Sequence, residues 1–165
     1  MYRVEVHTLL EQPTLVTRAR LAVPEIAAWI GPAFGRVAAA IRAAGAAPAG
    51  APFARFAPVD GRIDTFDIEA GFPVGAALAT SLATTGGADG EHGDVQLSAL
   101  PGGPAATTLH LGPYDAMTPA YDALEKWVAE QGGTVDGAPW ENYWSEPVGD
   151  PSSWQTQVVM PYRIG

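Results

Sequence analysis

An internal repeat with a spacing of 87 residues places the strongest constraint on how this chain folds. The segment PFARF at 52–56 returns as PWENY at 139–143, with a proline and two aromatic residues in the same places. Further pairs at this spacing are Pro32 with Pro119, Phe34 with Tyr121, Val37 with Leu124, Ile41 with Val128 and Gly45 with Gly132. A repeat of this length, present twice, is typical of two packed half-domains and is too long for a solenoid.

The repeat predicts one domain of 165 residues, with pseudo-repeats over about 1–82 and 94–165. The Gly-, Ala- and Thr-rich stretch over about 83–93 is interpreted as the linker between them. Within each repeat, alternating apolar residues indicate strands on both sides of one helical pattern. The predicted order is therefore strand, strand, helix, strand, strand, and this order occurs twice.

Proline and glycine mark the ends of the two predicted helices. Gly31 and Pro32 precede the apolar stripe of the first helix, and Thr118 and Pro119 precede that of the second. Glycine follows each stripe and ends the helix. We therefore predict an α+β fold with pseudo-twofold symmetry, in which antiparallel sheets carry helices on one face and a ligand cleft lies between the halves.

Glu141 stands out because its counterpart in the first repeat is Ala54, so the repeated fold does not require an acid at this place. Side chains alternate along a strand, which puts Glu141 and Tyr143 on one face and Trp140 on the other. We expect Glu141 on the face away from the helices. There it is either an ordinary solvated acid or the charged floor of a groove.

The net charge of −9 lies in the second half of the chain, where Lys126 and Arg163 are outnumbered by the acids. An acidic field repels phosphate backbones, so nucleic acid is not expected as a direct ligand. No apolar stretch approaches the roughly 20 residues of a membrane span, and no signal peptide is recognisable, which predicts a cytoplasmic protein. The three histidines lack zinc-ligand spacing and no phosphate-binding loop occurs, so we expect no metal and no cofactor.

Three segments in order resemble the GyrI-like domain, a small-molecule-binding module with a SOUL-like duplicated α+β fold. They are HLGPYDAM at 110–117, GAPWENYW at 137–144 and a final strand with Pro161. The same module is the effector-binding domain of AraC- and MerR-type multidrug regulators. No helix-turn-helix precedes Tyr2 in this sequence, which favours a stand-alone module. The resemblance implies an aromatic cleft with a glutamate at its floor, matched here by Glu141, for lipophilic, cationic or flat aromatic small molecules.

We expect aromatic walls from Trp140 and Tyr143. Tyr114 either caps the helix entry or supplies a phenol to the cleft, and Trp29, just before the first helix, is either a core residue or a wall that overhangs the groove. His110 is either a hydrogen-bond donor to the ligand or a packed strand residue. Glu69 is either an exposed strand residue or a second carboxylate that faces Glu141 and forms an acid–base pair with it.

Two other functions fit the same residues. Stand-alone relatives include cyclopropanoid cyclopropyl hydrolases, which open DNA-alkylating natural products with water. In such a reaction Glu141, with or without Glu69, activates the water, and Tyr143 or Tyr114 binds the substrate carbonyl. A lesser alternative is a gyrase-inhibitor-type protein that acts on a protein partner.

Overall fold

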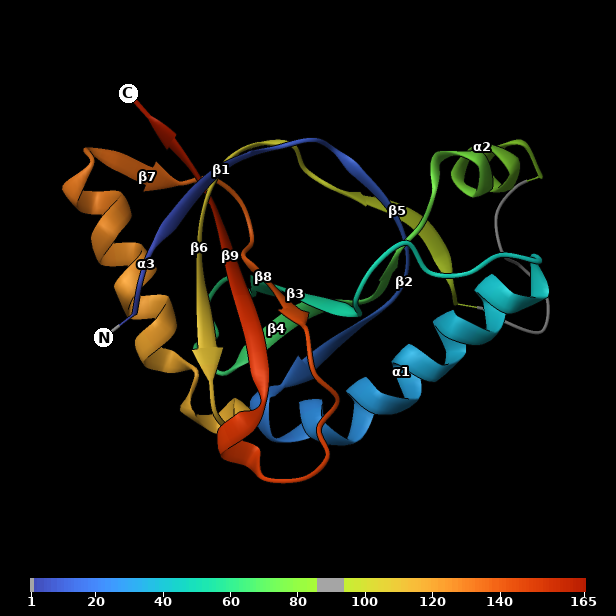
Figure 1. The fold of residues 1–165 in the computed structure, drawn as a ribbon, viewed down its shortest axis with the longest axis horizontal. Coiled ribbons are helices and arrows are strands. Elements are labelled where there is room, and N and C mark those ends of the chain that lie inside the picture. Colours follow the sequence, from blue (N-terminus) through green and yellow to red (C-terminus); the bar gives the residue numbers. More distant parts are fainter. Residues whose placement is uncertain (1, 86–93) are drawn as a thin grey trace. The chain divides into compact units, whose positions relative to one another are not determined.

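The computed structural model describes residues 2–85 and 94–165, which form two compact units (Figure 1). Unit 1 consists of Met1–Leu10 and Gly102–Gly165, and unit 2 of Glu11–Pro101. Each unit is an antiparallel sheet with its helices packed on one face, so the α+β class predicted from the sequence is confirmed.

In unit 2, the strand order in the sheet is β3 (Phe53–Pro58), β4 (Thr65–Pro73), β2 (Gln12–Ala22), β5 (Gln96–Leu100). Helix α1 (Val23–Ala43) and helix α2 (Ala76–Thr85) cover one face. Their core includes Leu15, Val37, Ile41, Val74 and Leu82.

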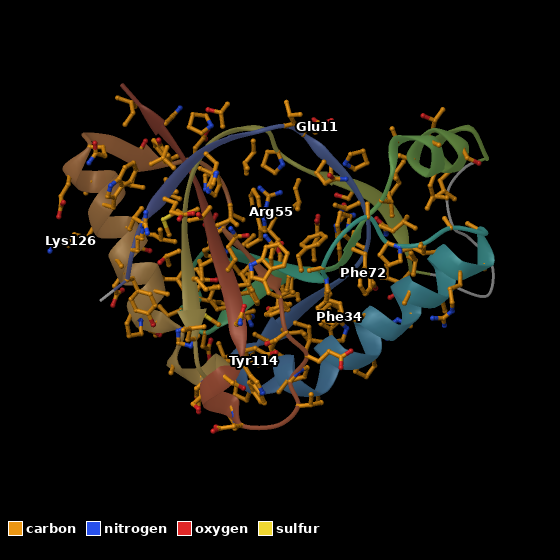
Figure 2. All side chains as sticks on the ribbon, in the orientation of Figure 1. Glu11, Phe34, Arg55, Phe72, Tyr114 and Lys126 are labelled. Carbon is orange, nitrogen blue, oxygen red and sulfur yellow. The ribbon has the colours of Figure 1, made fainter. Side chains whose placement is uncertain are left out.

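Two contacts show how closely unit 2 is packed. Phe34 of α1 and Phe72 of β4 meet edge to face with their ring centroids 6.0 Å apart, and Figure 2 shows the two side chains beside each other. Strand β4 also runs so near β2 that a Cβ on Gly71 would lie 1.9 Å from the carbonyl oxygen of Leu15. Glycine is therefore required at this position for steric reasons.

In unit 1, the strand order is β1 (Glu5–Leu9), β6 (Gly103–Leu111), β9 (Gln155–Ile164), β8 (Trp140–Tyr143). The short strand β7 (Gly133–Val135) pairs with the end of β9. Helix α3 (Thr118–Glu130) packs on this sheet, with two short 3₁₀ turns at Tyr114–Ala116 and Pro151–Ser153.

Helix α3 forms where the sequence predicted it. Leu124 and Val128 are buried against Ala106, Val158 and Met160 of the sheet. Lys126 lies on the opposite side of the helix and points away from the sheet (Figure 2). The apolar stripe at helical spacing thus explains both the helix and the face it buries.

Helix α1 differs from the prediction, because it begins at Val23 and contains Pro32 in its interior. Pro24 stands in its first turn, and the side chain of Glu25 accepts a hydrogen bond from the backbone N–H of Ala22 at 2.8 Å. These two residues are the start signal, and Pro32 only removes one internal hydrogen bond. Trp29 consequently lies inside α1 and does not precede it.

Two short elements and one pairing pattern were not predicted. Helix α2 and strand β7 are additional, and α2 extends into the predicted linker, whose residues 86–93 lie outside the described part of the chain. Strand β1 pairs with β6, and β5 pairs with β2. The first strand of each sequence repeat thus belongs to the compact unit that holds the rest of the other repeat.

Among the helices of residues 2–85 and 94–165, none is long and apolar enough to cross a bilayer.

Candidate functional site

The register of the unit 1 sheet decides which way Glu141 points. Glu141 lies opposite Val158, and Val158 belongs to the core under α3. Tyr143 lies opposite Thr156 on the same face. The expectation that Glu141 faces away from the helices is therefore wrong, because alternation separates the two faces but does not say which one the helix covers.

Two phenols hold the carboxylate of Glu141, which is 9% exposed. The hydroxyl of Tyr121, from α3, donates to Oε2 at 2.5 Å. The hydroxyl of Tyr143, two residues along β8, donates to Oε1 at 2.8 Å. No lysine or arginine of the described residues forms an ion pair with Glu141. The negative charge thus has hydrogen-bond donors but no lysine or arginine as countercharge.

Burial dominates the electrostatics of this cluster. It raises the pKa of Glu141, and the hydrogen bonds from Tyr121 and Tyr143 and the proximity of His110 offset only part of the rise. Burial, followed by the nearby charge of Glu141, raises the pKa values of Tyr121 and Tyr143. Both phenols therefore stay protonated at neutral pH and remain donors to the carboxylate.

A row of aromatic rings continues from Tyr143 toward solvent. The ring centroids of Tyr143 and Tyr114 are 5.6 Å apart in an edge-to-face contact, and those of Tyr114 and Trp154 are 5.0 Å apart. Tyr114 is 38% exposed and lies in the turn between β6 and α3 (Figure 2). Gly112, with φ +139°, allows this turn beside the ring of His110. The aromatic row thus leads from a buried carboxylate to the surface of unit 1.

His110 is buried on the same face as Tyr143, and both of its ring nitrogens have partners. Nε2 is 3.0 Å from the carbonyl oxygen of Pro113, and Nδ1 is 2.7 Å from the hydroxyl of Tyr2. Because a carbonyl only accepts, Nε2–H donates, and Nδ1 accepts from Tyr2 when the ring is neutral. This arrangement favours a packed histidine over a donor to a ligand, and the donor role stays a prediction.

The sequence model of the GyrI-like small molecule binding domain matches residues 5–163. The chain belongs to the GyrI-like family. No curated protein matches this GyrI-like chain in sequence, whereas several solved structures share its fold.

EcmrR in a complex with DNA has a TM-score of 0.74 and 19% identity over 99% of this chain. This chain spans 58% of that EcmrR chain, and it covers 99% of the EcmrR C-terminal domain solved alone, with a TM-score of 0.72 at 19% identity.

Two further structures share the fold. A hydrolase from Listeria innocua has a TM-score of 0.67 and 13% identity, over 98% of this chain and 92% of that one. SAV2435 bound to tetraphenylphosphonium has a TM-score of 0.59 and 11% identity, over 98% and 94%. At such identities these likenesses show the fold alone.

Within this GyrI-like domain, three predicted site residues come together, namely Glu141, Tyr143 and Tyr114. Trp140 is buried on the other face of the sheet, opposite Val159, and so points away from the carboxylate of its neighbour. Trp140 is therefore not a wall of the cluster that holds Glu141.

The two remaining predicted residues belong to unit 2. Trp29 is half-buried in α1. Glu69 forms an ion pair with Arg18, with 2.9 Å between Oε2 and Nη2, and lies 3.5 Å from the hydroxyl of Ser98. Glu69 is thus already neutralised on its own sheet, and its meeting with Glu141 stays a prediction.

Sequence reasoning missed Tyr121 and Trp154 as members of the cluster. Tyr121 lies on the apolar side of α3, where only its hydroxyl distinguishes it from a core phenylalanine. Trp154 follows the 3₁₀ turn Pro151–Ser153, and its indole N–H donates to the carbonyl of Val148 at 2.9 Å. A phenol on a buried helix stripe is the one signal that would have pointed to a buried acceptor.

Proposed function

We propose that this GyrI-like domain binds lipophilic cations, with Glu141 as the charge partner and the rings of Tyr143, Tyr114 and Trp154 as aromatic contacts. One observation carries the proposal. The buried carboxylate of Glu141 has two neutral donors and forms no ion pair with a lysine or arginine of the described residues.

A buried carboxylate without a countercharge destabilises the free protein, and a bound cation relieves that cost. The two phenols already donate to Oε1 and Oε2. A cation without N–H groups, such as a phosphonium or a quaternary ammonium, therefore gains Coulomb attraction without needing further hydrogen bonds. Each ring face near such a cation adds about 0.5 to 2 kcal/mol. We therefore expect the site to select its ligands by charge and lipophilicity more than by molecular shape.

Tetraphenylphosphonium is a suitable probe, because the fold neighbour SAV2435 was solved with it. Its neutral partner in the experiment is triphenylphosphine oxide, which keeps three of the four aryl rings. We expect Glu141→Gln to lose about tenfold in affinity for the phosphonium and little for the oxide. Glu125→Gln, on the exposed side of α3, makes the same change in net charge and is the control. Equal losses for both ligands would refute the charge partnership.

A hydrolase of the cyclopropanoid type is the second candidate, favoured by the raised pKa of Glu141, which suits a general base. Glu141 would take a proton from water as the water oxygen bonds to a cyclopropane carbon. The carbon–carbon bond that breaks would pass its electron pair to the conjugated carbonyl. The carbonyl oxygen would then take the proton that Glu141 removed from the water. The Listeria innocua hydrolase that shares this fold supports the candidate without assigning the activity to this chain.

Mass spectrometry separates turnover from binding. A hydrolase converts a cyclopropane-bearing alkylator into its water adduct in amounts far above the protein concentration. If the wild-type protein forms no more water adduct than Glu141→Gln does, the hydrolase proposal fails and only the cation-binding proposal remains. The gyrase-inhibitor reading stays a prediction, and a supercoiling assay with excess protein tests it.

A further inference from the structure

The other face of the unit 1 sheet borders a cavity of about 490 Å³. This volume falls within the roughly 300 to 1,000 Å³ of small-molecule sites. Strand β6 contributes Thr107 and Leu109, and β9 contributes Gln155 and Gln157. The cavity is therefore built on the central strands of the unit.

The register separates this cavity from the Glu141 cluster. Leu109 lies opposite Gln157, which in turn lies opposite Asn142. Asn142 stands between Glu141 and Tyr143 on β8, so its side chain projects from the opposite face. The two sites are thus back to back across one sheet.

Hydrogen-bond donors without partners gather in the cavity. Thr107 lines the cavity, and no hydrogen bond of its hydroxyl to another group occurs within the described parts of the chain. Gln157 accepts from the amide of Asn142 at 3.0 Å through Oε1, which leaves its own NH₂ group available. Both groups can therefore donate to a ligand in the cavity.

Arg3 adds a positive charge to the same cavity. The hydroxyl of Thr108 donates to the carbonyl of Arg3 at 2.7 Å and so fixes its backbone. Its guanidinium is exposed and forms no ion pair with any residue of 2–85 or 94–165. The fork of N–H groups on arginine matches a carboxylate, which it binds through two parallel hydrogen bonds.

Two apolar side chains that line the cavity are exposed to solvent. Trp144, directly after β8, is 52% exposed, and Leu109 is 46% exposed. An indole of this exposure beside a cavity offers a flat stacking surface. Hydrogen-bond donors together with an exposed aromatic ring suit a planar molecule with an acidic group.

We propose that this cavity is a second ligand site, for planar aromatic monocarboxylates. The carboxylate is bound by Arg3, with Thr107 and Gln157 as further donors, and the ring stacks on Trp144. Glu5 also lines the cavity, directly opposite Thr107. Its charge repels a second negative charge, so dianionic phosphate esters bind more weakly than carboxylates.

Calorimetric titration with 2-naphthoate tests the site, with 2-naphthamide and 2-naphthyl phosphate as the neutral and dianionic analogues. We expect Arg3→Gln to weaken 2-naphthoate about tenfold, and Glu5→Gln to strengthen it about twofold to threefold. Trp144→Leu weakens all three aromatic ligands. Arg163→Gln, an exposed arginine at the end of β9, removes the same charge outside the cavity and leaves binding unchanged.

Independence from the first site is measured in the same titration. Glu141→Gln and saturating tetraphenylphosphonium leave the affinity for 2-naphthoate unchanged if the two faces are separate sites. Failure of 2-naphthoate to bind, equal effects of Arg3→Gln and Arg163→Gln, or competition by the phosphonium would each overturn the proposal. The first two outcomes do not bear on whether Glu141 binds cations, and the affinity of Glu141→Gln for the phosphonium tests that proposal separately.

Discussion

The hydroxyl of Tyr121 lies 2.5 Å from Oε2 of Glu141, and this single hydrogen bond joins helix α3 to strand β8. Tyr121 lies on the helix and Glu141 on the strand. The apolar pattern of these two elements accounts for neither the hydroxyl nor the carboxylate. The bond fixes the carboxylate under the helix and lowers the pKa that burial raises.

Removing this donor should destabilise the folded protein. Tyr121→Phe leaves the buried Glu141 with one phenol, and we expect a loss of about 1 to 2 kcal/mol in the free energy of unfolding at neutral pH. Urea denaturation measures it. The loss should shrink at acidic pH, where a protonated Glu141 depends less on donors. Tyr162→Phe removes a phenol that forms no hydrogen bond in the described structure and is the control.

Replacing Glu141 itself should stabilise the protein at neutral pH. Because burial raises the pKa of Glu141, its stabilising contribution is fully present below the pKa of the unfolded chain and is lost as pH rises through the folded pKa. Glu141→Gln removes that loss, and we expect a gain of about 1 kcal/mol, with the wild-type and variant curves converging at acidic pH. Thermal unfolding at several pH values tests the sign. A variant less stable than wild type at neutral pH would contradict it.

Binding of tetraphenylphosphonium should strengthen as pH rises. The cation favours the ionised carboxylate, whose pKa lies above its ordinary value in the free protein. Affinity should therefore increase through the folded pKa of Glu141 and level off above it, with protons released on binding. Titrations in buffers of different ionisation enthalpy count those protons. The profile of Glu141→Gln should be flat.

The aromatic row should matter only for the site on the helix face. Trp154→Leu removes the ring against Tyr114, and we expect about threefold to thirtyfold weaker phosphonium binding. Trp144→Leu removes a ring of the same kind from the opposite face of the sheet and should leave that affinity unchanged. Equal effects of the two substitutions would mean that the rings act only through stability.

Gly71 offers a test of the packing in unit 2. Alanine there would bring a Cβ within 1.9 Å of the Leu15 carbonyl oxygen, so β4 must move from β2. We expect Gly71→Ala to cost about 3 kcal/mol or to prevent folding. Gly75→Ala, where no heavy atom lies within 4 Å of the new Cβ, should change stability little. Chemical denaturation compares the two.

Local patterns in the sequence were enough to predict several features of this protein. The apolar stripe of α3 predicted its helix and its buried face, since helical spacing acts within a few residues. Alternation along β8 predicted that Glu141 and Tyr143 share one face and Trp140 the other. The ordered segments around Tyr114 and Glu141 carried the resemblance to the GyrI-like family, which the match over residues 5–163 confirms.

Only the tertiary structure decided which face holds the site and which residues complete it. Strand register pairs residues far apart in sequence, and it placed Glu141 opposite Val158 and thus beneath α3. Tyr121 reaches the carboxylate only because the helix packs on that face. The pairing of β1 with β6 likewise joins segments about 100 residues apart. Such contacts depend on how strands and helices assemble, and no short-range period in the sequence records them.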